Sequence, residues 1–330
     1  MDELGLRDSA AQGGEKRGGA CQQCPRRCGR RGALARGYCG VGEELEIGGI
    51  YIHPWEEPPI SGQKGSGAIF FAGCNLRCIF CQNQEISRPE PGCYPRLSPE
   101  GLLDKMLELA ACGVHNIQFV TASHYIQQLE PVLRTFKARC PQLPLAWNSS
   151  GYESVESLAR LEGLIDIYLC DFKYYDNRYA RRYSGVADYR ERLLEALAEM
   201  RRQCPEPEFT QDGVLKRGLI LRHLQLPGLY FDSRKILHYL GAVYGESIIL
   251  SLMGQYTPLY GAKTCPEIDR KLRPREYEKL LELASGLPFA EVYAQELDAA
   301  EPFYVPPFEP ERALEILRLP LDSSLGQEEA

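Results

Sequence analysis

From residue 66 onward, short apolar runs alternate with longer helical stretches, and no other feature constrains the fold of this chain as strongly. Runs of this length and composition are typical of buried strands: AIFFAG (68–73), IQFV (117–120), LPLAWN (143–148), LIDIYLC (164–170), LILRHL (219–224) and SIILSL (247–252). Strands that alternate with helices form a parallel sheet with right-handed crossovers. The pattern therefore predicts an α/β fold, either an open or partial (β/α)6 barrel or a doubly wound sheet.

The rest of the chain is arranged around this core. Residues 1–20 are rich in glycine and charge, which predicts a disordered leader. Residues 21–65 contain four cysteines and many glycines but little periodicity, so a bound metal would be needed to order this module and its linker. We expect the barrel over residues 66–295 and a C-terminal extension over residues 296–330.

Composition and charge exclude several classes of protein. The 330 residues include 13 cysteines, yet no apolar signal segment is found near the N-terminus, and no run of about 18 apolar residues occurs. We therefore expect a cytoplasmic protein without a membrane segment, in which clustered cysteines hold metal or take part in catalysis. The net charge of −7 argues against a surface that binds nucleic acid.

Three cysteines follow the first predicted strand of the barrel. Cys74, Cys78 and Cys81 have the spacing C-x3-C-x2-C, and the aromatic Phe80 precedes the last of them. Three thiolates on a [4Fe–4S] cluster leave one iron without a protein ligand, and the amino and carboxylate groups of S-adenosylmethionine (SAM) can chelate that iron. The alternatives are a zinc site, which usually has four ligands in two pairs, or three unrelated cysteines. The spacing and the strand before it favour the cluster.

This segment resembles the radical SAM superfamily and, more narrowly, proteins similar to pyruvate formate-lyase activating enzyme, relatives of the activases of glycyl radical enzymes. The resemblance covers about residues 21–295 and is most specific in ISGQKGSGAIFFAGCNLRCIFCQNQEIS. It implies a partial (β/α)6 TIM-type barrel as the radical SAM core. It also implies that a flavodoxin- or ferredoxin-type donor reduces the cluster. SAM would then be cleaved to methionine and a 5′-deoxyadenosyl radical that abstracts hydrogen from a substrate.

The resemblance further implies residues that contact SAM. In activases of this superfamily a glycine-rich segment after the second strand lies against the methionine part of SAM, and here Thr121, Ala122 and Ser123 stand at that place. Small side chains still permit a close approach, although an N-capping Ser123 is the simpler interpretation. Asn148 and Ser149 end the third strand and could offer oxygen ligands.

Charged residues on the fourth and fifth strands complete this set, which also includes Phe80. Asp171 is expected to accept from ribose hydroxyls and Lys173 to pair with the SAM carboxylate, since alternation along a strand points both to one side. A surface ion pair is the alternative. Arg222 would be costly to bury unpaired, so we expect an anion beside it, either the SAM carboxylate or a buried Glu or Asp.

Two further segments carry weaker expectations. Gln255 and Tyr256 follow the sixth strand and would lie at the barrel mouth, near substrate. His53, Glu56 and Glu57 lie in a loop with three prolines, and such a loop usually presents solvated charge. We therefore assign no catalytic role to these three residues.

The N-terminal module has its own metal-ligand pattern. Cys21, Cys24, Cys28 and Cys39 have the spacing C-x2-C-x3-C-x10-C, which fits either tetrahedral zinc or a complete second iron–sulfur cluster. Either centre would be negatively charged, and nearby arginines could offset that charge. A basic metal knuckle that contacts RNA or a protein partner is the alternative. The arginines between Cys21 and Gly40 are Arg26, Arg27, Arg30, Arg31 and Arg36.

Three kinds of function stay open at this point. The first candidate substrate is a glycyl radical enzyme, whose backbone glycine would lose hydrogen, and this expectation follows from the resemblance. Related proteins act instead on peptides, nucleotides or small molecules. A different class is a non-catalytic iron–sulfur or zinc adaptor, which would use the N-terminal module to bind a partner.

Overall fold

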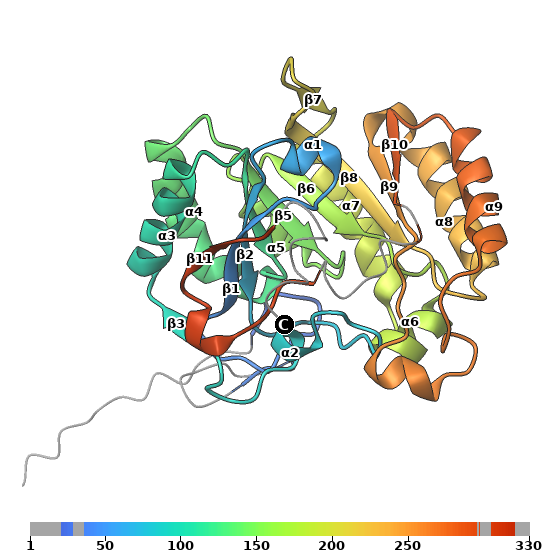
Figure 1. The fold of residues 1–330 in the computed structure, drawn as a ribbon, viewed down its shortest axis with the longest axis horizontal. Helices are drawn as coiled ribbons and strands as arrows, with labels where there is room; N and C mark the ends of the chain where they lie inside the picture. Colours follow the sequence, from blue (N-terminus) through green and yellow to red (C-terminus); the bar gives the residue numbers. More distant parts are fainter. Residues whose placement is uncertain (1–20, 29–35, 296, 298–304, 321–330) are drawn as a thin grey trace, which may run out of the picture.

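The computed structural model describes residues 21–28, 36–295, 297 and 305–320. The predicted leader (1–20) therefore lies outside the described residues, as do Arg30, Arg31 and part of the predicted C-terminal extension. Within the described ranges, eleven strands form one sheet, and helices flank it (Figure 1).

The strands in chain order are β1 (Leu45–His53), β2 (Ser66–Phe71), β3 (Arg96–Leu97), β4 (Ile117–Val120), β5 (Leu145–Ser149), β6 (Ile167–Asp171), β7 (Glu208–Phe209), β8 (Leu215–Leu224), β9 (Ile249–Met253), β10 (Glu291–Ala294) and β11 (Ile316–Arg318). The α-helices are α1 (Pro58–Ser61), α2 (Gln84–Ser87), α3 (Pro99–Ala111), α4 (Ile126–Arg139), α5 (Val155–Ala159), α6 (Asn177–Ser184), α7 (Tyr189–Gln203), α8 (Tyr230–Val243) and α9 (Pro274–Ser285). Short 3-10 helices occur at Ser123–Tyr125, Gly245–Ser247, Tyr260–Thr264 and Pro310–Arg312.

The strands that the sequence predicts, β2, β4, β5, β6, β8 and β9, lie side by side in chain order and are parallel to one another. Each crossover thus adds the next strand on the same side, whereas a doubly wound sheet reverses its direction at a switch point. Among the described strands, the order ends at β10 and β11 without closing on itself. The fold is therefore a partial (β/α)6 barrel, as predicted, and the doubly wound alternative is wrong.

Strand β1 is not predicted by the periodicity of the sequence. It lies within residues 21–65, pairs antiparallel with β2 and parallel with β11, and all nine of its residues are buried. Glu46, Gly48 and Gly49 interrupt its apolar residues, so β1 lacks the continuous apolar run by which the other buried strands are recognised. Strand β1 brings His53 to the amino end of β2, opposite Ser66.

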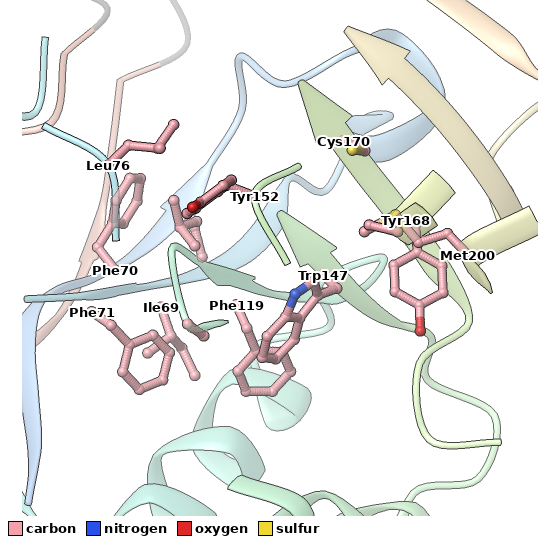
Figure 2. Close-up of a cluster of buried hydrophobic side chains, with 14 of the residues drawn as sticks. Ile69, Phe70, Phe71, Leu76, Phe119, Trp147, Tyr152, Tyr168, Cys170 and Met200 are labelled. Atoms are coloured by element: carbon pink, nitrogen blue, oxygen red, sulfur yellow. The ribbon is translucent and has the colours of Figure 1, made fainter. Parts of the chain in front are cut away.

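Alternation along the parallel strands separates an apolar outer face from a mixed inner face. Phe119 on β4 and Trp147 on β5 are fully buried, and their ring centroids are 6.3 Å apart within the cluster drawn in Figure 2. The adjacent residues Gln118 and Asn148 point to the inner face, where Asn148 Nδ2 donates to Gln118 Oε1 (3.0 Å). The inner face therefore presents polar side chains to the barrel interior.

Helix α1 fills the amino end of the barrel interior. Its residue Ile60 is fully buried in a cluster with Ala146, Ile167, Ile220 and Ile249. Figure 1 shows α1 at the end of the sheet opposite to α2 and α6. The carboxyl ends of the parallel strands, where barrel enzymes place their chemistry, therefore lie at the end that α1 does not fill.

A single carboxylate joins α9 to the turn that follows β8. Glu276 accepts from the backbone N–H groups of Arg273 (3.1 Å) and Gly228 (3.3 Å) and from the guanidinium of Arg270 (2.6 and 2.7 Å). The hydrogen bonds from Arg270 are the largest cause that lowers the pKa of Glu276 from 4.5 to about 2.

Replacing Glu276 with Gln should lower the free energy of unfolding by about 1–2 kcal/mol at pH 7, because these donors favour the ionised carboxyl group. A lowered folded-state pKa contributes stability above the ordinary pKa, and that contribution disappears as the pH falls. The difference between wild type and Glu276→Gln should therefore shrink from about pH 4.5 to about pH 2. Urea unfolding of the metal-free protein at several pH values measures it, with the exposed Glu278→Gln as control. A difference that does not change with pH would contradict this account.

Candidate functional site

The three cysteines of the triplet lie in the loop that follows β2, at the carboxyl end of the sheet. Cys78 is 8% exposed, and Cys74 and Cys81 are half-buried. The loop turns at Gly73, which has φ +87°, and a Cβ atom there would lie 2.8 Å from the carbonyl oxygen of Cys39. The start of the loop therefore requires glycine, both for its backbone conformation and for this close approach.

The chemistry of this donor set fits an iron–sulfur cluster. Burial raises the pKa of the Cys74 and Cys81 thiols, and the neighbouring cysteine sulfurs raise both further, while the ammonium of Lys173 acts in the opposite direction. Crowded, buried sulfurs of this kind hold a negative charge poorly by themselves. A bound metal reverses the effect, because it deprotonates the thiols that coordinate it.

The arrangement differs from a site for one ion. Within the part of the chain that the structure describes, no group of three or more His, Cys, Asp or Glu side chains is placed to hold a single metal ion. The cysteine ligands of a [4Fe–4S] cluster each bind a different iron, so their sulfurs are spread around the cluster.

Aromatic residues pack beside the triplet. Phe80 is buried, and its ring meets that of Tyr256 edge-on with centroids 5.7 Å apart. The Tyr256 hydroxyl donates to the carbonyl oxygen of Ile268 (2.9 Å). The structure thus joins the expected barrel-mouth residue Tyr256 to Phe80 in one wall beside the cysteine loop.

Arg222 on β8 is the centre of a polar network on the inner face. Its guanidinium donates to Asp171 Oδ1 (2.9 Å), to Asn148 Oδ1 (2.6 Å) and, at 3.4 Å, to Glu56 Oε2. Lys173 Nζ donates to Asp171 Oδ2 (2.6 Å). The structure therefore brings four of the predicted SAM-contact residues together, and it supplies Arg222 with the buried carboxylates that the sequence left as one of two alternatives.

Charge balance in this network favours its ionised form. Burial alone would raise the pKa of Asp171, but Arg222 and Lys173 outweigh it and hold that pKa below its usual value. Lys173 also lies close enough to Cys78 for the sulfur to raise the pKa of its ammonium. Lys173 thus connects the cysteine loop to the interior network.

The prediction of solvated charge for the loop after β1 is wrong. His53 and Glu57 are buried, and Glu56 accepts from Gln118 Nε2 (3.0 Å) as well as from Arg222. Burial lowers the pKa of His53 to about 4. Glu56 thus reaches Arg222 as its second carboxylate partner, and an arginine on an apolar strand was the sequence signal for such a partner.

A second buried carboxylate, which the sequence did not single out, binds two predicted SAM-contact residues. Glu153 is 1% exposed, and the hydroxyls of Ser123 and Ser149 both donate to its Oε1 atom, the latter at 2.5 Å. Burial raises the pKa of Glu153, and the two hydroxyls act against that shift. In this structure the hydroxyls of Ser123 and Ser149 are therefore hydrogen-bonded to Glu153, and their contact with SAM stays a prediction.

Thr121, at the end of β4, has a strained backbone. Its φ is +59°, in the left-handed region that β-branched residues rarely adopt. The Thr121 N–H donates to the carbonyl oxygen of Asn148 (2.9 Å) on the neighbouring strand, which helps to hold this conformation. Strain of this kind concentrates at functional sites, and here it lies at the position where the resemblance implies glycines.

The four cysteines of the N-terminal module gather beside the triplet loop. Cys24 and Cys39 are buried, Cys21 is half-buried and Cys28 is exposed. A Cβ atom on Gly37 would lie 3.0 Å from Cys28 Sγ and 3.4 Å from Cys39 Sγ, so both sulfurs flank this glycine. Burial raises the pKa of Cys24 to about 12, and nearby Cys21 and Cys39 contribute to that shift.

Hydrogen bonds to backbone carbonyl groups connect this module to the triplet loop. The Cys74 N–H donates to the carbonyl oxygen of Cys39 (3.2 Å), and Arg26 Nε donates to that of Asn75 (2.9 Å). Arg77 donates to the carbonyl oxygen of Tyr38 (2.7 Å). The two cysteine-containing segments therefore form one structural unit.

Sequence comparisons give the chain its relatives. Residues 68–216 match the family described as the radical SAM superfamily. An uncharacterized protein of Methanocaldococcus jannaschii is 31% identical over 276 residues, which cover 80% of this chain and 74% of that protein.

Solved structures show a similar fold. Methylornithine synthase (PylB) matches with a TM-score of 0.50 and 14% identity, covering 78% of this chain and 72% of that chain. A domain of pyruvate-formate lyase-activating enzyme from Bacteroides vulgatus matches at a lower TM-score of 0.39 and 10% identity, covering 52% of this chain and 92% of that domain. Among the described helices, none is long and apolar enough to cross a membrane.

Replacing Thr121 with Gly should raise the free energy of unfolding by about 0.5–1 kcal/mol. Relief of the left-handed strain is worth about 1–2 kcal/mol, and the added freedom of the unfolded chain offsets part of it. Urea unfolding of the metal-free, reduced protein measures the change. Thr121→Ala is the control, because it keeps a Cβ atom and most of the strain. A Gly variant less stable than the Ala variant would show that Thr121 is not strained.

Proposed function

The chain belongs to the radical SAM superfamily, and from this premise we propose that it holds a [4Fe–4S] cluster on Cys74, Cys78 and Cys81 and cleaves SAM reductively. The observation that carries the proposal is the loop after β2, which holds the three thiols as neighbours at the carboxyl end of a partial barrel. When bound, the cluster would supply one electron to SAM, and cleavage would give a 5′-deoxyadenosyl radical.

The chain's own residues would bind and orient SAM. Lys173 binds Asp171 and lies near Cys78, and this supports our proposal that its ammonium pairs with the SAM carboxylate. Asp171 and Asn148 present oxygens on the same inner face, where ribose hydroxyls would donate. The backbone at Thr121 permits a close approach to the methionine part.

Hydrogen abstraction from a glycyl radical enzyme is the first substrate that we propose. The support is the resemblance to pyruvate formate-lyase activating enzyme-like proteins in the triplet segment. A flavodoxin- or ferredoxin-type donor in the cytoplasm would supply the electron. A peptide, nucleotide or small molecule is the alternative substrate, and a gene for a glycyl radical enzyme beside this one would favour the first.

Anaerobic reconstitution with iron, sulfide, dithionite and SAM should yield 5′-deoxyadenosine. Replacing Cys78 with Ala should reduce the yield to the background measured without protein, because the two cysteine ligands that remain would not be enough to hold the cluster. Liquid chromatography of the products measures the yield. The matched control is Cys112→Ala, which removes an exposed thiol at the end of α3 and should leave the yield unchanged.

Two results would count against the enzyme. A wild-type sample with a spectroscopically verified [4Fe–4S] cluster that makes no 5′-deoxyadenosine would favour the non-catalytic adaptor. A Cys78→Ala variant as active as wild type would remove the triplet from the mechanism.

We also propose a second, structural metal centre on Cys21, Cys24, Cys28 and Cys39. Its support is that the Cys28 and Cys39 sulfurs flank Gly37 and that Cys21 and Cys39 lie near Cys24. The Tyr38 N–H donates to Cys28 Sγ (3.3 Å), a contact that would stabilise a thiolate. Four thiolates suit zinc or an iron–sulfur cluster by donor type, and among the described residues these four side chains, like the triplet, are not placed as ligands of a single ion.

Replacing Cys24 with Ser should remove one metal centre and leave the other. Elemental analysis of the purified protein should show loss of zinc, or of the iron of one cluster, and thermal unfolding should shift to lower temperature because the module loses its metal. The Cys78→Ala variant should lose the other centre. If Cys24→Ser keeps the full metal content of wild type, the N-terminal cysteines hold no metal.

A further inference from the structure

Two residues that are not cluster ligands form a series of hydrogen bonds that ends on Sγ of Cys78, a proposed ligand of the cluster. Ser184 Oγ lies 2.9 Å from Cys78 Sγ, and Tyr174 Oη lies 2.8 Å from Ser184 Oγ. Both Ser184 and Tyr174 are fully buried. The hydrogen-bonding groups of this chain are thus removed from solvent, so their bonds to one another are not exchanged for bonds to water.

The direction of the chain follows from what each group can donate. A metal-bound thiolate has no hydrogen, so the Ser184 hydroxyl must donate to Cys78 Sγ. The Ser184 oxygen then accepts from the Tyr174 phenol, and burial raises the pKa of that phenol so that it stays protonated. Both donors therefore point toward the sulfur.

The fold fixes this geometry. Ser184 is the last residue of α6, which ends at Gly185 in the left-handed conformation. The Ile79 N–H donates to the carbonyl oxygen of Tyr183 (2.9 Å), so the end of α6 is tied to the triplet loop next to the Ser184 contact. Tyr174 packs edge-on against Tyr189 with centroids 5.6 Å apart, which limits rotation of its ring.

We propose that Ser184, oriented by Tyr174, raises the reduction potential of the cluster through its hydrogen bond to Cys78 Sγ. A hydrogen bond to a ligand sulfur draws electron density from it and stabilises the more negative, reduced cluster, and such bonds are a main determinant of iron–sulfur potentials. Ser184 would thus adjust the potential at which the cluster accepts the electron that SAM cleavage needs, and Tyr174 is a positioning residue that orients Ser184. The inference rests on the proposed cluster at the triplet.

The test is a redox titration of the full-length, anaerobically reconstituted protein without SAM, followed by electron paramagnetic resonance of the reduced cluster. Ser184→Ala should lower the equilibrium constant for one-electron reduction about tenfold, which corresponds to a midpoint potential about 59 mV more negative. Tyr174→Phe should lower it less, about threefold. The double variant should match Ser184→Ala, because Tyr174 acts through Ser184.

Matched controls separate this effect from the loss of any buried hydroxyl. Ser233 is buried and bonds His223, and Tyr168 is buried and donates to Gln203, so both lie in other hydrogen-bonded pairs. Ser233→Ala and Tyr168→Phe should keep the wild-type midpoint.

The outcomes are distinguishable from those of the proposed function. If wild type assembles no [4Fe–4S] cluster, the proposed function fails and this inference fails with it. If the wild-type cluster titrates but Ser184→Ala has the same midpoint potential, only this inference is overturned. Should Ser184→Ala not fold, Tyr174→Phe takes its place, and an unchanged midpoint potential in that variant has the same meaning. An additive double variant would also overturn the role given to Tyr174.

Discussion

A largely buried guanidinium holds together the interior on which the site depends. Arg222 is bound by Asp171 from β6 and by Glu56 from the loop after β1, so it joins the two ends of the barrel interior through ion pairs. An uncompensated charge at this depth would be strongly destabilising. Because Asp171 also binds Lys173, the same network fixes the cation that lies near Cys78 of the triplet.

Around this interior, the two cysteine segments act as one unit although they lie far apart in sequence. The carbonyl oxygen of Cys39 accepts from the N–H of Cys74, and the close contact at Gly73 leaves no room for a side chain between them. Arg26 reaches both Asn75 and Gly185, and so ties the module to the end of α6. Order in the module and order in the triplet loop are therefore linked.

Local pattern predicted the six parallel strands and the place of the triplet, because both depend on spacing along the chain. The nine-residue strand β1 was missed because Glu46, Gly48 and Gly49 interrupt its apolar residues, so it does not form the continuous apolar run by which the other strands were recognised. The burial of Glu56 and the pairing of Ser123 and Ser149 with Glu153 depend on residues distant in sequence, so no local pattern could reveal them. Arg222 gave the one usable hint, since a charge on an apolar strand demands a counterion.

The apolar cluster that Ile60 of α1 forms with side chains of the strands closes the amino end of the barrel interior, so the interior does not run through from one end to the other. A molecule that approaches the polar inner face from the ends of the strands would therefore enter at their carboxyl ends, where the triplet loop and the Arg222 network lie.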